Sequence, residues 1–215
     1  MMNDSAPVLK KRYPYATIAL AAANIVYFLL LMAVGAVEST AKMVEWGALY
    51  MAKGTYVGSP FRILTSRFMH FDIYHLGSNL LMLFVVGDML EERLGRGRFV
   101  ISYLISGLVG NAAAVWWYHL QGATVVSAGA SGAVYGLVGV LCCLVFRKRG
   151  SIPGFSRERV LLMIFLMLYS GFVNTGINVA AHVGGLAVGL LCGLLFGGSR
   201  KRRQNNRENT PFSGM

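Results

Sequence analysis

Charged residues are scarce in this sequence. Only 13% of its 215 residues are charged, whereas an ordinary soluble domain has about 25%. Hydrophobic residues make up 55% of the chain, which is too apolar for a water-soluble globule and too apolar for a disordered segment to stay solvated. We therefore predict an integral membrane protein whose solvent is the lipid bilayer.

Acidic residues and metal-binding patterns are also few. The chain has 9 acidic residues against 20 basic ones, but the basic residues lie between apolar segments and form no aromatic-interleaved surface of the kind that binds nucleic acid. The three cysteines form no C-x-x-C pair, and no H-E-x-x-H sequence accompanies His70 and His75. We expect no nucleic-acid partner, no metal and no cofactor.

Six apolar stretches approach the roughly 20 residues that a helix needs to cross a bilayer. They are Tyr15–Val37, His75–Leu90, Phe99–Tyr118, Ser131–Phe146, Val160–Val173 and Ile177–Phe196. Most basic residues then fall on one side, the cytoplasmic side, if both termini lie inside. The sequence therefore predicts an all-α, six-transmembrane-helix bundle with cytoplasmic termini, in what we expect to be a bacterial plasma membrane.

These stretches divide the chain into three parts. We predict a cytoplasmic N-terminus at 1–14, a six-span domain at 15–198, and a basic, disordered cytoplasmic tail at 199–215. The first connection, residues 38–74, is a long outer loop with aromatic residues among polar ones. That composition is typical of an interfacial segment.

Polar side chains inside a span need a reason, because hydrocarbon offers no hydrogen-bond partner. With a helical rise of about 1.5 Å per residue, measured from the first basic residue after each span, Ser131 lies roughly 24 Å from that residue. His75 and His182 each lie roughly 27 Å, and Asn79 roughly 21 Å, from theirs. Four polar residues from three spans therefore share one layer of the membrane.

Glycine spacing predicts which of these residues meet. His182, Gly185 and Gly189 follow one face of the last span, and small residues at such spacing let another helix approach closely. The fourth span begins Gly129-Ala130-Ser131-Gly132, a second small-residue face. If the two faces pack together, Ser131 comes within reach of His182.

A serine beside a histidine can act as a nucleophile, since the imidazole takes the hydroxyl proton. No acidic residue lies in a span near His182, so we predict a dyad with Tyr135 as a candidate for orienting the imidazole. Asn79 lies one helical turn after His75 on the same face. We expect both side chains, with the backbone N–H of Ser131, to stabilise an oxyanion.

At these residues the sequence closely resembles the rhomboid intramembrane serine proteases. The resemblance covers roughly 60–196 in the same order and topology. It rests on the Gly129–Gly132 motif, on Ala181-His182 with Gly185-x-x-x-Gly189, and on the segment from His70 to Asn79.

The resemblance implies that Ser131 is the nucleophile, that His182 is the base, and that Tyr135 stacks on His182. It also implies that Glu91 and Arg93 brace the second span and the outer loop, and that the fifth span with the 174–178 loop forms a gate. The resemblance also implies structural roles for His70, Arg62, Gly185 and Gly189. The family usually has Trp-Arg in the outer loop where this chain has Phe61-Arg62, and we expect Arg62 to keep a bracing role.

The sequence thus predicts a serine endopeptidase that cleaves transmembrane segments of membrane proteins near the outer membrane boundary, through an acyl-enzyme. The alternative is a catalytically inactive rhomboid-like protein that binds client transmembrane helices. Such a protein would be expected to lack Ser131 or His182, and both are present. A transporter would be expected to show related halves with broken helices, and the sequence has no internal repeat.

Overall fold

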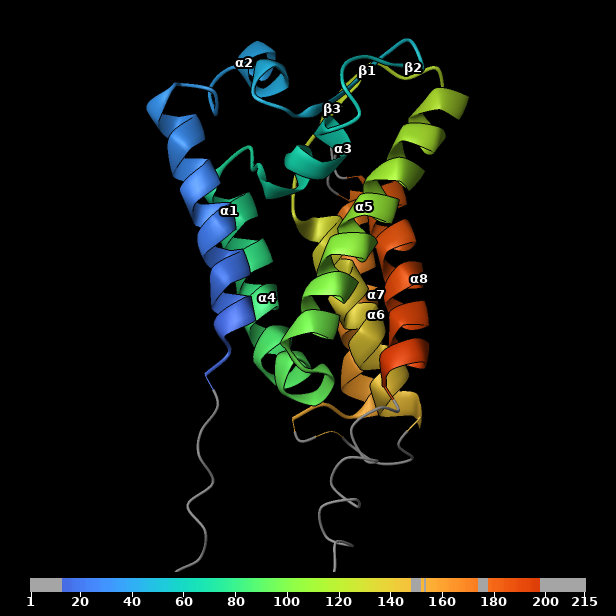
Figure 1. Cartoon of the computed structure of the whole chain (residues 1–215). Coiled ribbons are helices and arrows are strands. Elements are labelled where there is room, and N and C mark those ends of the chain that lie inside the picture. The colour runs from blue at the N-terminus through green and yellow to red at the C-terminus, as the bar shows by residue number, and fades with distance from the viewer. Residues whose placement is uncertain (1–12, 148–151, 153, 174–177, 198–215) are drawn as a thin grey trace, which may run out of the picture.

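The computed structural model describes residues 13–147, 152, 154–173 and 178–197. The expected N-terminal and C-terminal tails lie almost wholly outside the described residues, as do residues 174–177 of the expected gate. Six long helices run side by side in the described part (Figure 1). They are α1 (Tyr15–Ala33), α4 (Ile73–Leu94), α5 (Arg96–Leu120), α6 (Ser131–Arg147), α7 (Arg157–Val173) and α8 (Val179–Phe196).

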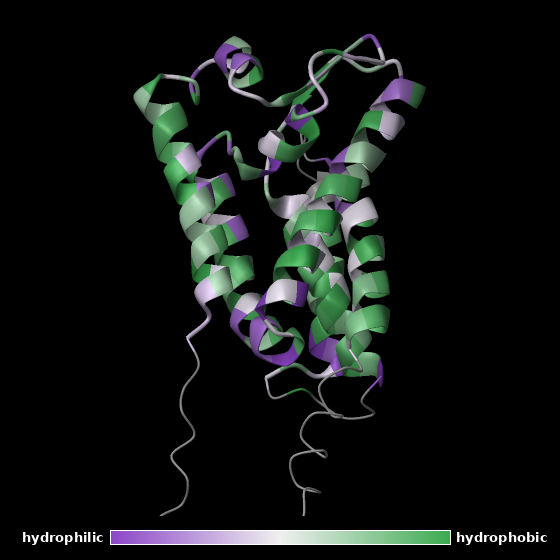
Figure 2. Cartoon of the chain, viewed as in Figure 1, coloured by the Kyte–Doolittle hydropathy of each residue, from purple (hydrophilic) through white to green (hydrophobic). Residues whose placement is uncertain are grey.

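Helix length and apolarity agree with a membrane protein. By length and composition, α1, α4, α5 and α8 can each cross a membrane, whereas α6 is apolar but only 17 residues long. Figure 2 shows apolar residues along the bundle and hydrophilic residues gathered mainly at its two ends. The count of six spans therefore stays a prediction.

Local sequence signals explain where the helices begin and end. The Asp72 carboxylate accepts a hydrogen bond from the backbone N–H of His75 at 2.7 Å, so α4 starts two residues earlier than its apolar run. Gly95, with φ of +82°, ends α4, and Gly35, with φ of +64°, follows the end of α1. Positive φ favours glycine because a side chain would clash with the backbone.

Helix α6 lies at the centre of the bundle. It packs against α8, α5, α4 and α7, and residues 132–141 are all buried. Close approach to α8 depends on glycine. A Cβ on Gly185 would lie 2.8 Å from the carbonyl carbon of Gly132, and one on Gly189 would lie 2.5 Å from that of Gly136. The two backbones therefore touch with no room for a side chain.

One end of the bundle is covered by residues 34–72 and 121–130, which we call the loop layer (Figure 1). It contains α2 (Thr40–Glu45), β1 (Leu49–Ala52), β2 (Thr55–Tyr56), α3 (Arg62–Thr65), a 3₁₀ turn at Ser66–Phe68, and β3 (Val125–Ser127). The strands form an antiparallel sheet in the order β2-β1-β3, with Leu49 opposite Ser127. The segment that leads into α6 is therefore paired with the segment that follows α2.

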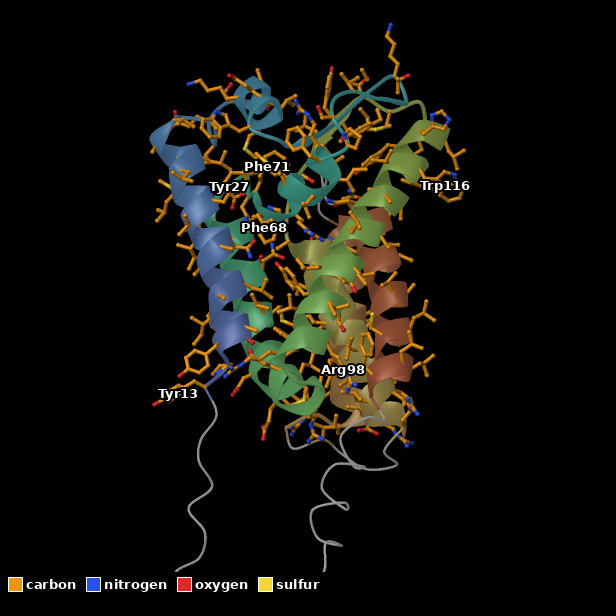
Figure 3. All side chains as sticks on the ribbon, viewed as in Figure 1. Tyr13, Tyr27, Phe68, Phe71, Arg98 and Trp116 are labelled. Atoms are coloured by element: carbon orange, nitrogen blue, oxygen red, sulfur yellow. The ribbon has the colours of Figure 1, made fainter. Side chains whose placement is uncertain are left out.

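Two arginines hold the loop layer together. Arg62 donates from Nη1 to the backbone oxygens of Val44 and Ala48, so it ties α3 to the end of α2 and the start of β1. Arg67 is only 2% exposed and donates to the Leu104 oxygen on α5. Figure 3 shows Phe68 of the loop layer between α1 and α5, whereas Trp116 points away from the bundle.

Glu91 braces the opposite end of the bundle. Its carboxylate accepts hydrogen bonds from the N–H groups of Ala16 and Thr17, at 3.1 and 2.8 Å, and from the Thr17 hydroxyl. A carboxylate stabilises the free N–H groups and the dipole at a helix N-terminus. Glu91 also pairs with Arg96 at 3.4 Å. The resemblance implied a brace of the second span and the outer loop. The contacts of Glu91 tie the second span, α4, to α1 and α5 and do not run to the outer loop, and Arg93 lies half-buried in the same last turn of α4.

Candidate active site

The nucleophile candidate lies at a sharp turn between β3 and α6. Ser131 is the first residue of α6, and Gly129 before it has φ of +140°. A Cβ on Gly129 would also lie 2.7 Å from the His75 ring, so both conformation and space require glycine there. The Gly129 N–H donates to the Ser66 oxygen at 2.9 Å, which fixes the turn against the loop layer.

Ser131 and His182 are in hydrogen-bond contact. The Ser131 Oγ lies 2.8 Å from Nε2 of His182, which is only 5% exposed. The hydroxyl donates to Nε2 in the tautomer that carries the ring proton on Nδ1. Tyr135, one turn after Ser131, stacks on the imidazole with ring centres 4.0 Å apart and an 11° angle between planes.

In the described part of the chain, no carboxylate is hydrogen-bonded to the His182 imidazole. Within the described residues, the buried Nδ1 of His182 has no hydrogen-bond partner. A serine triad would place an acid at this nitrogen to hold the ring. Among the described residues, the ring is held by Tyr135 and by the packing of α8 on α6.

A cavity of about 760 Å³ opens beside this pair. It lies between α4, the β3–α6 turn, α7 and the start of α8. Its lining includes polar side chains from each of α4, α6 and the start of α8. They are His75, Ser78, Asn79, Ser131, Tyr135, Asn178 and His182.

The structure brings His75 and Asn79 to the same cavity. The His75 ring stacks with Phe71 and meets the His70 ring edge-on at 5.1 Å, and it touches the turn at Gly129. Asn79 is buried and donates one amide hydrogen to the His75 oxygen at 2.8 Å. An amide group has two hydrogens, so one remains for a group in the cavity.

His70 is a packing residue in this structure. It is fully buried in the loop layer, and burial lowers the pKa of its imidazole to about 3. The ring is therefore neutral at physiological pH. No group of three or more histidine, cysteine or acidic side chains that could hold a metal ion is found in the described part of the chain.

A model of the rhomboid domain matches residues 57–199. This chain belongs to the rhomboid family. It is 31% identical over 178 residues to Rhomboid protease GluP of Bacillus subtilis (strain 168), covering 81% of this chain and 33% of GluP. It is 33% identical over 112 residues to Rhomboid protein 1, mitochondrial, of Saccharomyces cerevisiae, covering 51% of this chain and 30% of that protein. The matched part thus spans about a third of the length of these relatives.

Family membership and the apolar helices make this rhomboid-family chain an integral, multi-pass membrane protein. At the family level the match indicates an intramembrane protease. The matched region contains all the site residues named above, from Arg62 to Gly189. It excludes α1, the helix that Glu91 caps.

The sequence did not predict the hydrogen-bond partners of two further polar residues near this site. Asn111 on α5 donates to the Ser66 hydroxyl and to the Ile63 oxygen, each at 2.9 Å, so it supports the residue that holds Gly129. Asn178 caps α8 and lines the cavity. An asparagine just before an apolar helix is a cap signal. Its hydrogen-bond partner across the cavity, Ser127, lies in no recognisable sequence motif.

Proposed function

We propose that this rhomboid-family protein is an intramembrane serine endopeptidase that cleaves transmembrane segments of membrane proteins. The observation that supports this most directly is the 2.8 Å contact between Ser131 Oγ and His182 Nε2 beside an open cavity. In this proposal the protein has six spans with both termini in the cytoplasm. The site lies near the outer boundary of a plasma membrane.

The chemistry proceeds in two acyl-transfer steps. His182 Nε2 removes the Ser131 proton while Oγ attacks the peptide carbonyl, and the imidazolium then gives that proton to the leaving amine. His182 next takes a proton from water while the water oxygen attacks the acyl carbonyl carbon. The imidazolium then returns that proton to Ser131 Oγ as the ester bond breaks, which releases the acid product and restores both residues. Both steps pass through an oxyanion. The free amide hydrogen of Asn79, the His75 ring and the backbone N–H of Ser131 are the donors for it.

The bilayer restricts which peptides can react. A spanning helix has all its carbonyls in internal hydrogen bonds, so a substrate segment must unwind before its carbonyl reaches Ser131. The cavity supplies polar partners for an unwound stretch in Ser78 and Asn79. We expect preferred cleavage in segments that contain glycine, alanine or proline. Glycine and proline disfavour the helix and therefore lower the cost of unwinding.

Labelling with a fluorophosphonate tests the proposal on the purified full chain in detergent. We expect covalent labelling at Ser131 that disappears in His182→Ala and persists in Ser39→Ala, a serine that caps α2 away from the cavity. Cleavage of a model transmembrane substrate should follow the same pattern. A correctly folded protein that is neither labelled nor active would instead be a non-catalytic binder of transmembrane helices.

A further inference from the structure

Asn178 makes hydrogen bonds in two directions at the start of α8. Its side-chain oxygen accepts from the Ala181 N–H at 3.0 Å, and its backbone oxygen accepts from the His182 N–H at 3.2 Å. Its side-chain amide donates to the Ser127 hydroxyl at 2.9 Å. A helix cap needs only the first of these bonds, so the bond to Ser127 requires a separate explanation.

Ser127 belongs to the segment that carries the nucleophile. It is the last residue of β3 and lies four residues before Ser131. Ser127 pairs with Leu49 in the sheet. Two residues later, the Gly129 N–H donates a hydrogen bond to the backbone oxygen of Ser66. Leu49 and Ser66 therefore hold this segment on one side. Asn178, the cap residue of α8, is hydrogen-bonded to it on the other side.

The Asn178–Ser127 bond completes a pair of restraints around His182. Three residues beyond His182, Gly185 presses against Gly132, which fixes how closely α8 approaches α6. One turn before His182, Asn178 fixes the start of α8 to β3. With no partner on Nδ1 in the described structure, the imidazole depends on these helix positions for its distance to Ser131.

We propose that Asn178 is a positioning residue for the Ser131–His182 pair and acts through its hydrogen bond to Ser127. This inference rests on the proposed function, because it assigns Asn178 a part in serine chemistry beyond helix capping. Through its bond to Ser127, Asn178 fixes the start of α8 relative to the segment that carries Ser131. It thereby keeps the His182 imidazole within hydrogen-bond distance of the Ser131 hydroxyl.

Three variants separate positioning from capping. Asn178→Ser keeps a capping oxygen but is too short to reach Ser127, and Ser127→Ala removes the same bond from the other side. Asn178→Asp keeps the cap and can accept a hydrogen bond from the Ser127 hydroxyl, so it restores the link. The control is Ser39→Ala, which removes the cap contact of α2 in the loop layer without touching the cavity.

The test measures fluorophosphonate labelling of Ser131 together with kcat and KM on a transmembrane substrate. We expect Asn178→Ser and Ser127→Ala each to lower the labelling rate and kcat by about 10- to 100-fold, as small misplacements of reacting groups do, with KM little changed. The double variant should be no slower than either single one, because both remove one bond. Asn178→Asp should keep most of the parent rate.

Other outcomes would overturn the inference. Normal labelling with a raised KM would make Asn178 a substrate contact only, and normal values throughout in Asn178→Ser would make it a cap only. Hydrogen exchange of the peptide over residues 178–182 gives a readout that needs no activity. Amide hydrogen exchange at residues 178–182 should become faster in both Ser127→Ala and Asn178→Ser. Unchanged exchange in Ser127→Ala would refute a restraining role for the Asn178–Ser127 bond. If the parent chain is not labelled at all, the proposed function fails, while the exchange result still decides whether the bond restrains α8.

Discussion

Gly189→Ala is the smallest change that tests whether helix contact holds the two reactive groups together. The new Cβ would lie 2.5 Å from the carbonyl carbon of Gly136 and 2.7 Å from its Cα. Carbon atoms rest about 3.5–4.0 Å apart, so α8 must move away from α6 by about 1 Å. Applied to the 2.8 Å contact between Ser131 and His182, such a shift breaks the hydrogen bond.

The expected losses follow from that displacement. A misplacement of about 1 Å costs roughly 100-fold in rate, and overpacking costs about 1–3 kcal/mol of stability. We would measure kcat on a transmembrane substrate and the melting temperature in detergent. Gly185→Ala, one turn nearer His182, should behave similarly because its Cβ would meet Gly132 at 2.8 Å.

The matched control is Gly77→Ala on α4. Gly77 is an exposed helical residue, and a Cβ there would meet nothing within 4 Å. Alanine in a helix interior is better than glycine by about 0.5–1 kcal/mol, so this variant should be slightly more stable and fully active. Full activity in Gly189→Ala would refute the idea that backbone contact between α6 and α8 sets the distance between Ser131 and His182.

Three further predictions concern the site and the loop layer. Ser131→Ala and His182→Ala should each abolish cleavage with little change in melting temperature, and a double variant much worse than either would mean that the two do not act as one unit. Asn79→Ala should lower kcat by about 100- to 1000-fold, as loss of an oxyanion donor does, and an effect confined to KM would argue against that role. His70 has a folded-state pKa of about 3, below the roughly 6.5 of an unfolded histidine, so the unfolded chain binds more protons and stability should fall as pH drops from about 6.5 toward 3. In thermal melts across this range, His70→Gln should lose stability less steeply than the parent, and equal slopes would exclude a contribution from His70.

Helical spacing in the sequence was sufficient to predict which polar residues gather near Ser131. The apolar runs, the depth shared by Ser131, His182, His75 and Asn79, and the glycine stripe after His182 all follow from local periodicity. These features predict a face and a depth for each residue. The glycine spacing brings Ser131 to His182 only if the two small-residue faces meet, and that depends on how the helices pack together.

The tertiary structure decided the contacts between distant segments. It brought Ser131 to His182, set Tyr135 on the imidazole, and turned Glu91 toward α1. The residues of these pairs come from different helices or lie far apart in the sequence, so no local spacing predicts their contact.

The smaller polar contacts depend even more on packing. Asn111, Ser66, Ser127 and Asn178 are ordinary polar residues whose roles come from their partners. A buried amide must find a hydrogen bond wherever the fold leaves one, and only the packed bundle fixes where that is. Composition and periodicity were enough for the membrane class and for the prediction of Ser131 and His182 as a pair, whereas the contacts that hold these two side chains 2.8 Å apart depend on the folded chain.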